Sequence, residues 1–207
     1  MEWIKKYRLE ILIFLAIILV FFVLRLPNLT LQPIFADEAI YIRWAQVMKA
    51  EPTLRFLPVT DGKTPLFMWT LIPFFNLFSD PLLAGRFLSV ISGFFTLLGV
   101  FFLGRSIFSL KAAFLGALIY TVVPYTVFFD RMALVDSMLA AFTIWSLVLT
   151  LWLLKNLRLH LSIILGILLG GAWLVKTPAE MNLLSLVTTI VAFDFRKNKI
   201  LKLVLFW

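Results

Sequence analysis

Two acidic residues stand side by side in the stretch IFADEAIYIRWAQ, residues 34–46, just after a long apolar run. A carboxylate held close to a membrane can act as a general base, taking the proton of a hydroxyl group as that group attacks a substrate. Asp37 and Glu38 also suit the start of a helix, because Asp is a favoured N-cap and Glu in the first turn complements the helix dipole. Capping explains one acid well and the second less well. The local sequence therefore favours a catalytic role for the pair, and helix capping stays open as the alternative.

Two lysines stand where apolar segments begin or end. Lys63 lies in DGKTPLFMW, residues 61–69, after the turn that Asp61-Gly62 predicts, and Lys176 lies in GGAWLVKTPAE, residues 170–180. An ammonium group at that depth can bind a lipid phosphate. The alternatives are a snorkelling lysine for Lys63 and an interface anchor for Lys176, and each motif alone leaves the choice even.

A third charged group interrupts two apolar runs in FFDRMALVDSML, residues 128–139. The planar guanidinium of Arg131 suits a phosphate or a carboxylate, while Asp130 and Asp136 can support an acceptor. The alternative is a local pair between Arg131 and a neighbouring carboxylate that stabilises a tight turn. No phosphate-binding glycine loop, Ser/His/Asp set or metal-ligand spacing accompanies these residues.

The composition predicts an integral membrane protein. Of 207 residues 62% are apolar and only 14% are charged, and the mean hydropathy is +1.02. With no Cys and a single His160, neither a disulfide framework nor a His or thiolate metal centre can form. The sequence indicates no particular cofactor and allows a divalent metal ion. The net charge of +8 is explained by membrane orientation, so we expect no nucleic-acid partner.

The elements that must position these residues are apolar runs. The first, preceded by Lys5, Lys6 and Arg8, is expected to be a retained signal anchor, because no small-residue cleavage site follows it. The runs are Leu9–Leu26, Pro65–Phe78, Phe87–Leu103, Ala112–Phe129, Ser137–Leu154, Leu161–Val175 and Leu183–Phe193, and a last one starts near Leu203. Because the chain stops inside that last run, we predict that residues 1–207 are the N-terminal part of a longer protein.

The run Pro65–Phe78 decides the topology. Its 14 residues span about 21 Å of helix, short of the ~30 Å of a bilayer core. If this run does not cross the membrane, 11 of the 19 basic residues lie on the inner side of the membrane. If it does cross, only 6 of them lie there. The positive-inside rule therefore favours an interfacial or re-entrant segment, a cytoplasmic N-terminus and an outer first loop over about residues 27–86. All the candidate site residues then lie on the outer face, where costly ionisable groups mark a functional site.

Within this loop, apolar residues recur at helical spacing. Ile40, Tyr41, Trp44, Val47 and Met48 share one face, which predicts a short amphipathic helix lying on the membrane surface. The pair Glu51-Pro52 should end this helix, because the residue before a proline disfavours helical geometry.

The order of the motifs ADE, GKTPLFMW, GRFLSVISGFFTLLGVFFLGRSIF, DRMALVDSMLAAF and GAWLVKTPA resembles the bacterial relatives of the protein O-mannosyltransferases. These are membrane glycosyltransferases of the GT-C fold, similar also to the aminoarabinose transferases that modify lipid A. The resemblance covers about residues 30–180 and implies an all-α polytopic bundle with about six or seven transmembrane helices.

The resemblance also implies a function. It predicts transfer of a hexose or pentose, with inversion, from a polyprenyl-phosphate-linked donor to a lipid, glycan or protein acceptor on the outer face of the plasma (inner) membrane. By the same resemblance, Asp37 with Glu38 would be catalytic, and Lys63, Arg131 and Lys176 would bind the donor phosphate. Asp136 and Asp130 would support the acceptor. The alternatives are a transporter of a lipid or polar solute, and an inactive fragment that serves as an assembly partner.

Overall fold

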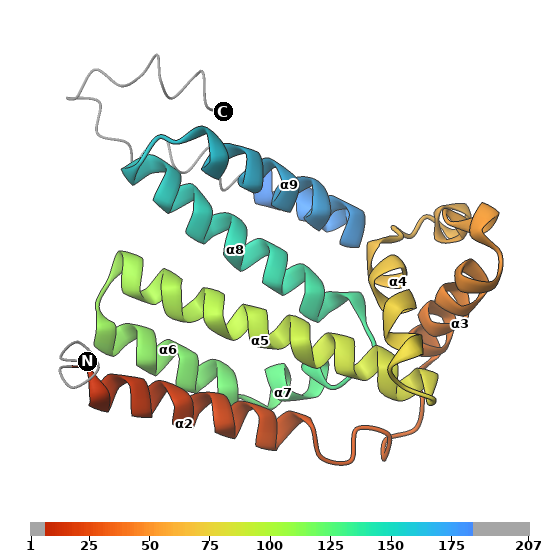
Figure 1. Cartoon of the computed structure of the whole chain (residues 1–207), viewed down its shortest axis with the longest axis horizontal. Coiled ribbons are helices and arrows are strands. Elements are labelled where there is room, and N and C mark those ends of the chain that lie inside the picture. The colour runs from red at the N-terminus through yellow and green to blue at the C-terminus, as the bar shows by residue number, and fades with distance from the viewer. Residues whose placement is uncertain (1–6, 184–207) are drawn as a thin grey trace.

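The computed structural model describes residues 7–183, and within that range every regular element is helical (Figure 1). The predicted all-α membrane bundle is thereby confirmed. Its helices are α2 (Arg8–Arg25), α5 (Pro81–Ile107), α6 (Leu110–Val122), α7 (Pro124–Asp130), α8 (Val135–Lys155) and α9 (Leu159–Val175). The segment between α2 and α5 contains α3 (Ala36–Ala50), α4 (Leu66–Leu71) and the 3-10 turns η1 (Pro52–Leu54), η2 (Leu57–Asp61) and η3 (Ile72–Asn76), and η4 (Thr177–Glu180) follows α9.

The long helices lie side by side, with α5 in the centre between α6 and α8 (Figure 1). By length and composition α5 and α8 can cross a membrane, and α6 with α7 can form a third span bent by 64°. The predicted run Ala112–Phe129 is thus two helices, because Pro124 has no N–H to continue the ladder and begins α7 instead.

Other predicted spans lack the length or the apolar composition that a membrane-crossing helix needs. The helix α2 has 18 residues and carries Arg8, Glu10 and Arg25, while α9 has 17 residues. The predicted runs Leu183–Phe193 and from Leu203 lie outside the described residues. The segment α4–η3 covers 11 residues, Leu66–Asn76, and lies beside α3 at one end of the bundle (Figure 1).

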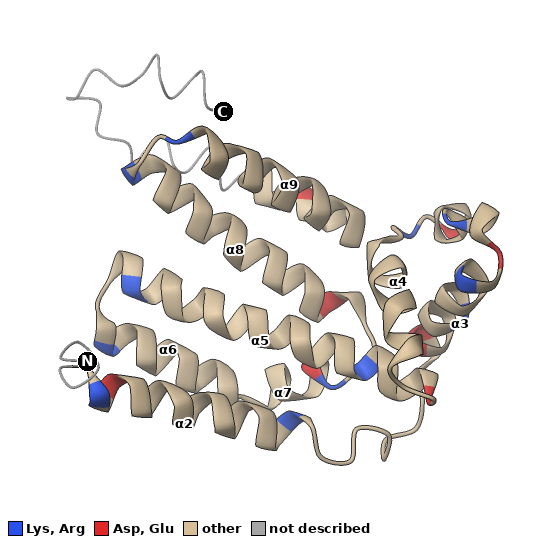
Figure 2. Ribbon diagram, viewed as in Figure 1, with Lys and Arg blue, Asp and Glu red and all other residues tan. Residues whose placement is uncertain are grey.

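Charged residues gather at the two ends of the bundle (Figure 2). One end holds the start of α2 and the turns between α5 and α6 and between α8 and α9, with Arg105, Lys111, Lys155 and Arg158. The opposite end holds α3, α4, the α7–α8 turn and the end of α9. All the candidate site residues lie on this second end.

The predicted amphipathic helix is present as α3 and ends before Glu51, as expected. Its buried face differs from the predicted one: Ile42 and Ala45 are buried beside Tyr41 and Met48, whereas Ile40 is 43% exposed. The cause is contact with protein instead of lipid, because α3 packs on α4 and α5. Its N-cap is Phe35 and not Asp37. The alternative of helix capping holds for Glu38, whose carboxylate accepts from the Phe35 N–H over 2.9 Å.

Candidate active site

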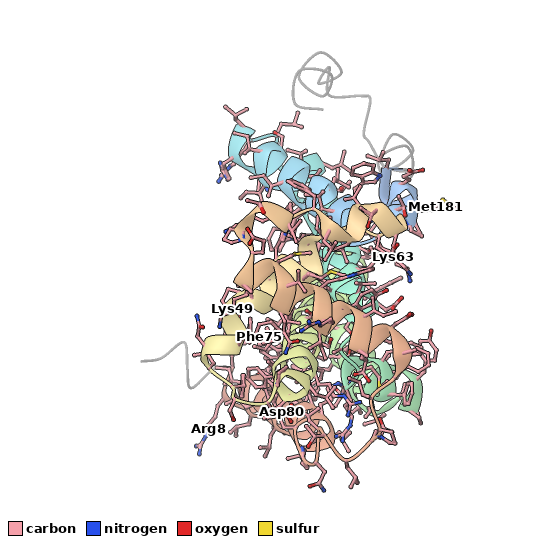
Figure 3. The ribbon with its side chains drawn as sticks, turned by 90° about the vertical axis from the view of Figure 1, so that its right-hand side faces the viewer. Arg8, Lys49, Lys63, Phe75, Asp80 and Met181 are labelled. Atoms are coloured by element: carbon pink, nitrogen blue, oxygen red, sulfur yellow. The ribbon has the colours of Figure 1, made fainter. Side chains whose placement is uncertain are left out.

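A pocket of about 240 Å³ opens at this end of the bundle, where α3, the start of α4, the start of α8 and the end of α9 meet. Its polar lining comes from Tyr41, Lys63, Thr64, Lys176 and Thr177. Figure 3 looks onto this end and labels Lys63 beside α3. The structure therefore brings two of the predicted phosphate-binding cations to one cavity.

Lys176 is held by a carboxylate on the neighbouring helix. It follows the last residue of α9, where Thr177-Pro178 breaks the helix as the sequence predicted. Its Nζ donates to Oδ1 of Asp136, in the first turn of α8, over 2.9 Å. Both side chains are 41% exposed, so the pair stays accessible and a ligand can share the ammonium group.

Lys63 follows a sharp turn. Gly62 ends η2 with φ +67°, in the left-handed region that favours glycine, as Asp61-Gly62 predicted. The Lys63 ammonium lies 5.9 Å from the centre of the Tyr41 ring. Among residues 7–183 no carboxylate pairs with Lys63, so its charge is available to an anion.

The segment before Lys63, residues 52–62, is held against α4 by Trp69. The Trp69 indole N–H donates to the carbonyl oxygen of Arg55 over 2.7 Å, and the Phe56 ring packs edge-on against Trp69 at 5.3 Å. The Lys63 backbone N–H donates to the carbonyl oxygen of Pro58, which fixes the end of this segment. These contacts set where the ammonium group of Lys63 can reach.

Asp37 is the second residue of α3 and is half-buried. In the part of the chain that the structure describes, its side chain makes no hydrogen bond and no ion pair. It lies one turn before Tyr41 on the same helix face, and its charge acts on the Tyr41 hydroxyl. Asp37 is thus an unengaged carboxylate one turn before Tyr41, which lines the pocket.

Glu38, by contrast, is fully buried and fully engaged. Arg86 donates to both of its oxygens over 2.8 Å, the N–H of Ala133 donates over 2.7 Å, and the N–H of Phe35 donates over 2.9 Å. Burial alone would raise the pKa of Glu38, but hydrogen bonds from Arg86, Phe35 and Ala133 outweigh it and lower the pKa. Glu38 remains ionised and joins α3, α5 and the α7–α8 turn.

Arg86 is a site residue that the sequence alone does not single out. Besides Glu38, it donates to the carbonyl oxygens of Leu29, Gln32 and Pro33 over 2.6–3.2 Å. One side chain in the first turns of α5 therefore fixes both the entry to α3 and its first turn. The available signal was an arginine near the start of a largely apolar helix, which must find a partner.

Asp130 lies in a second buried network and does not line the pocket. It accepts hydrogen bonds from Arg25 over 2.8 Å, from Tyr120 over 3.0 Å and from Ser137 over 2.9 Å. Its charge is therefore balanced by Arg25 of α2, which lies 105 residues away in the sequence.

Gly93 on α5 makes room for this network. A Cβ at Gly93 would lie 2.4 Å from Cγ of Asp130, which three side chains hold in place. We expect Gly93→Ala to lower the free energy of unfolding by about 1–3 kcal/mol through overpacking. The measurement is the thermal midpoint in detergent. Gly166→Ala on α9 is the control, because its Cβ would meet nothing within 4 Å. Equal midpoints for the two variants would contradict the tight fit.

Arg131 does not lie with the two lysines. Its guanidinium donates to the carbonyl oxygens of Leu24, Arg25 and Asn28 over 3.1–3.2 Å, which satisfies the open end of α2. The alternative of a local pair with a neighbouring carboxylate is wrong, because Asp130 pairs with Arg25 and Asp136 with Lys176.

The structure therefore brings Lys63 and Lys176 to one pocket together with Tyr41. Asp136 pairs with Lys176, and Asp37 lies one turn before Tyr41 on α3. Glu38, Asp130 and Arg131 belong to the surrounding framework. Across residues 7–183 no three His, Asp or Glu side chains gather as metal ligands.

An apolar cavity of about 710 Å³ lies next to this pocket, between α4, α5, α8 and α9. Its wall is almost wholly apolar and includes the aromatic residues Phe74, Phe95, Phe142 and Trp145. The helices α4 and α8 line both hollows, Met68 and Val135 in the pocket and Thr70 and Met138 in the apolar cavity. A ligand with a polar head and an apolar tail could occupy both.

Comparison with known proteins gives one family. The family described as dolichyl-phosphate-mannose-protein mannosyltransferase matches residues 62–207, more than half of the chain. The match includes Lys63, Asp136 and Lys176, while Asp37 and Glu38 precede it. No curated protein and no solved structure matches the chain.

Proposed function

Because the chain belongs to the dolichyl-phosphate-mannose-protein mannosyltransferase family, it is a membrane glycosyltransferase of the GT-C type, and we propose that it transfers a hexose or pentose from a polyprenyl-phosphate donor to an acceptor hydroxyl or amine. The observation that carries this proposal is one pocket with two lysines, beside an unengaged carboxylate and an apolar cavity.

In the proposed reaction, Lys63 and Lys176 hold the donor phosphate. As the bond to the sugar breaks, the phosphate gains negative charge, and cations placed beforehand stabilise that charge. Asp136 keeps Lys176 in position through their 2.9 Å hydrogen bond. The polyprenyl chain lies in the apolar cavity, where its burial contributes to donor binding.

We assign the proton transfer to Asp37. Glu38 already accepts four hydrogen bonds from Arg86, Phe35 and Ala133, so neither of its oxygens is open to an acceptor. Asp37 takes the acceptor proton as the acceptor attacks the anomeric carbon from the side opposite the phosphate. A single displacement of this kind inverts that carbon.

The count of basic residues over the whole sequence, 11 of 19 on the inner side if Pro65–Phe78 does not cross the membrane, supports an outer-face site in the plasma membrane. The end of the bundle opposite the pocket carries Arg8, Arg105, Lys111, Lys155 and Arg158, the basic turns that the positive-inside rule assigns to the cytoplasm.

The test is a transfer assay in reconstituted vesicles. Labelled polyprenyl-phosphate-mannose and a pentosyl counterpart are offered with membranes as the source of lipid, glycan or protein acceptor. We expect a labelled acceptor and release of polyprenyl phosphate. Movement of the intact donor across the vesicle membrane with no transfer would favour a transporter and contradict the proposal.

Lys63→Ala should lower kcat/KM in this assay by about 10- to 100-fold, because it removes a charge-assisted contact to the phosphate. The matched control is Lys49→Ala. Lys49 is an exposed lysine that donates to Asn76 and does not line the pocket. The labels for Lys63 and Lys49 stand well apart in Figure 3. An unchanged kcat/KM for Lys63→Ala would remove Lys63 from the phosphate site.

A further inference from the structure

Tyr41 occupies the middle of the candidate site. It lies on α3 one turn after Asp37 and lines the pocket together with Lys63 and Lys176. Its side chain is fixed, since only 4% of the residue is exposed and its ring packs against Trp44 at 6.1 Å and Phe67 at 6.2 Å. The position of its hydroxyl is thus set by the core and needs no ligand to order it.

Charges of both signs surround this hydroxyl. Burial raises the pKa of Tyr41, the negative charges of Asp37 and Asp136 raise it further, and Lys176 opposes them. The net shift is upward, so the phenol keeps its proton at neutral pH and acts as a hydrogen-bond donor. The Lys63 ammonium lies over the same ring at 5.9 Å.

The hydroxyl has no acceptor within the described part of the chain, residues 7–183. A tyrosine whose ring is buried usually donates to a protein group. Tyr120 of this chain does so, donating to Asp130 over 3.0 Å. Tyr41 instead stands at a cavity that also presents two ammonium groups, which indicates that its acceptor is an anionic ligand.

We propose that the Tyr41 hydroxyl donates a hydrogen bond to a phosphate oxygen of the donor, between Lys63 and Lys176, and that this bond strengthens as the sugar leaves. This inference rests on the proposed function. During transfer, the bond between the anomeric carbon and the bridging oxygen breaks, and its electron pair stays on the phosphate. The acceptor oxygen or nitrogen forms the new bond, and its proton passes to Asp37. Tyr41 keeps its own proton throughout.

The test compares two ligands of the same tail, farnesyl phosphate and farnesol, on the full chain in detergent. We expect Tyr41→Phe to weaken the binding of farnesyl phosphate about tenfold and to leave the binding of farnesol unchanged, because the ring and its packing stay. Tyr125→Phe is the control, since Tyr125 is 70% exposed on α7 and does not line the pocket. Lys63→Ala should weaken farnesyl phosphate and spare farnesol.

Each further outcome has a defined meaning. If Lys63→Ala loses affinity for farnesyl phosphate and Tyr41→Phe does not, the inference about Tyr41 is overturned and the proposed function stands. If Tyr41→Phe weakens both ligands equally, the residue acts through packing and the inference also fails. If the wild-type chain binds farnesyl phosphate no more tightly than farnesol, the proposed function fails together with it.

Discussion

Asp37→Asn should lower sugar transfer by about 10²- to 10⁴-fold, the range that general base catalysis supplies. The amide keeps the size of the side chain and removes its ability to take a proton. Because Asp37 makes no hydrogen bond or ion pair among the described residues, we expect an unchanged thermal midpoint and unchanged donor binding. The loss should thus fall on kcat, measured by transfer under saturating donor.

The matched control is Asp61→Asn. Asp61 is an exposed acid at the end of η2, within the same segment between α2 and α5, and it does not line the pocket. We expect this variant to transfer sugar at the wild-type rate. A wild-type rate in Asp37→Asn would remove Asp37 from the reaction and leave the site without the proton acceptor proposed here.

Arg86→Leu should have the largest effect on stability, a loss of about 3–5 kcal/mol. Removing one partner of a buried ion pair leaves the other charge uncompensated. Here the carboxylate of Glu38 would stay buried, and the carbonyl oxygens of Leu29, Gln32 and Pro33 would lose their donor. Unfolding in detergent, followed by circular dichroism, measures the loss.

Arg43→Leu is the control for this experiment. Arg43 is an exposed arginine on α3 that makes no hydrogen bond or ion pair with Glu38, and its replacement should leave the midpoint unchanged. Because Arg86 fixes the first turn of α3, which carries Asp37, any folded Arg86→Leu protein should also lose transfer. A midpoint equal to that of the wild-type chain would show that the pair contributes nothing to stability.

The helices could be predicted from the sequence because burial in a bilayer or a bundle demands continuous apolar runs. The run Ser137–Leu154 corresponds to α8, and Glu51-Pro52 marks the end of α3. The break at Pro124 was missed because the residues on both sides are equally apolar. The direction of the α3 face was missed because only the packing of α5 decides which side of a short helix is buried.

Partner choice is the part of the site that the sequence could not supply. The sequence alone does not distinguish the roles of Asp37 and Glu38. Their roles differ in the structure because Arg86 pairs with Glu38, 48 residues away, and not with Asp37. Sequence proximity suggested Arg131 as the partner of its neighbouring acid, yet Asp130 pairs with Arg25 across 105 residues. By contrast, Lys63 and Lys176 line one pocket and Asp136 pairs with Lys176, because each of the three stands where an apolar segment begins or ends at the same end of the bundle.

The buried pair of Arg25 and Asp130 also has a consequence for how the chain is made. Asp130 is synthesised 105 residues after Arg25, which at cellular elongation rates is a delay of about 5–20 s. During that time the guanidinium at the end of α2 must stay hydrated at the membrane surface, because burying it alone is costly. The helix α2 can therefore reach its final position in the membrane only after α7 has left the ribosome. The insertion of α2 is thus completed late in biogenesis.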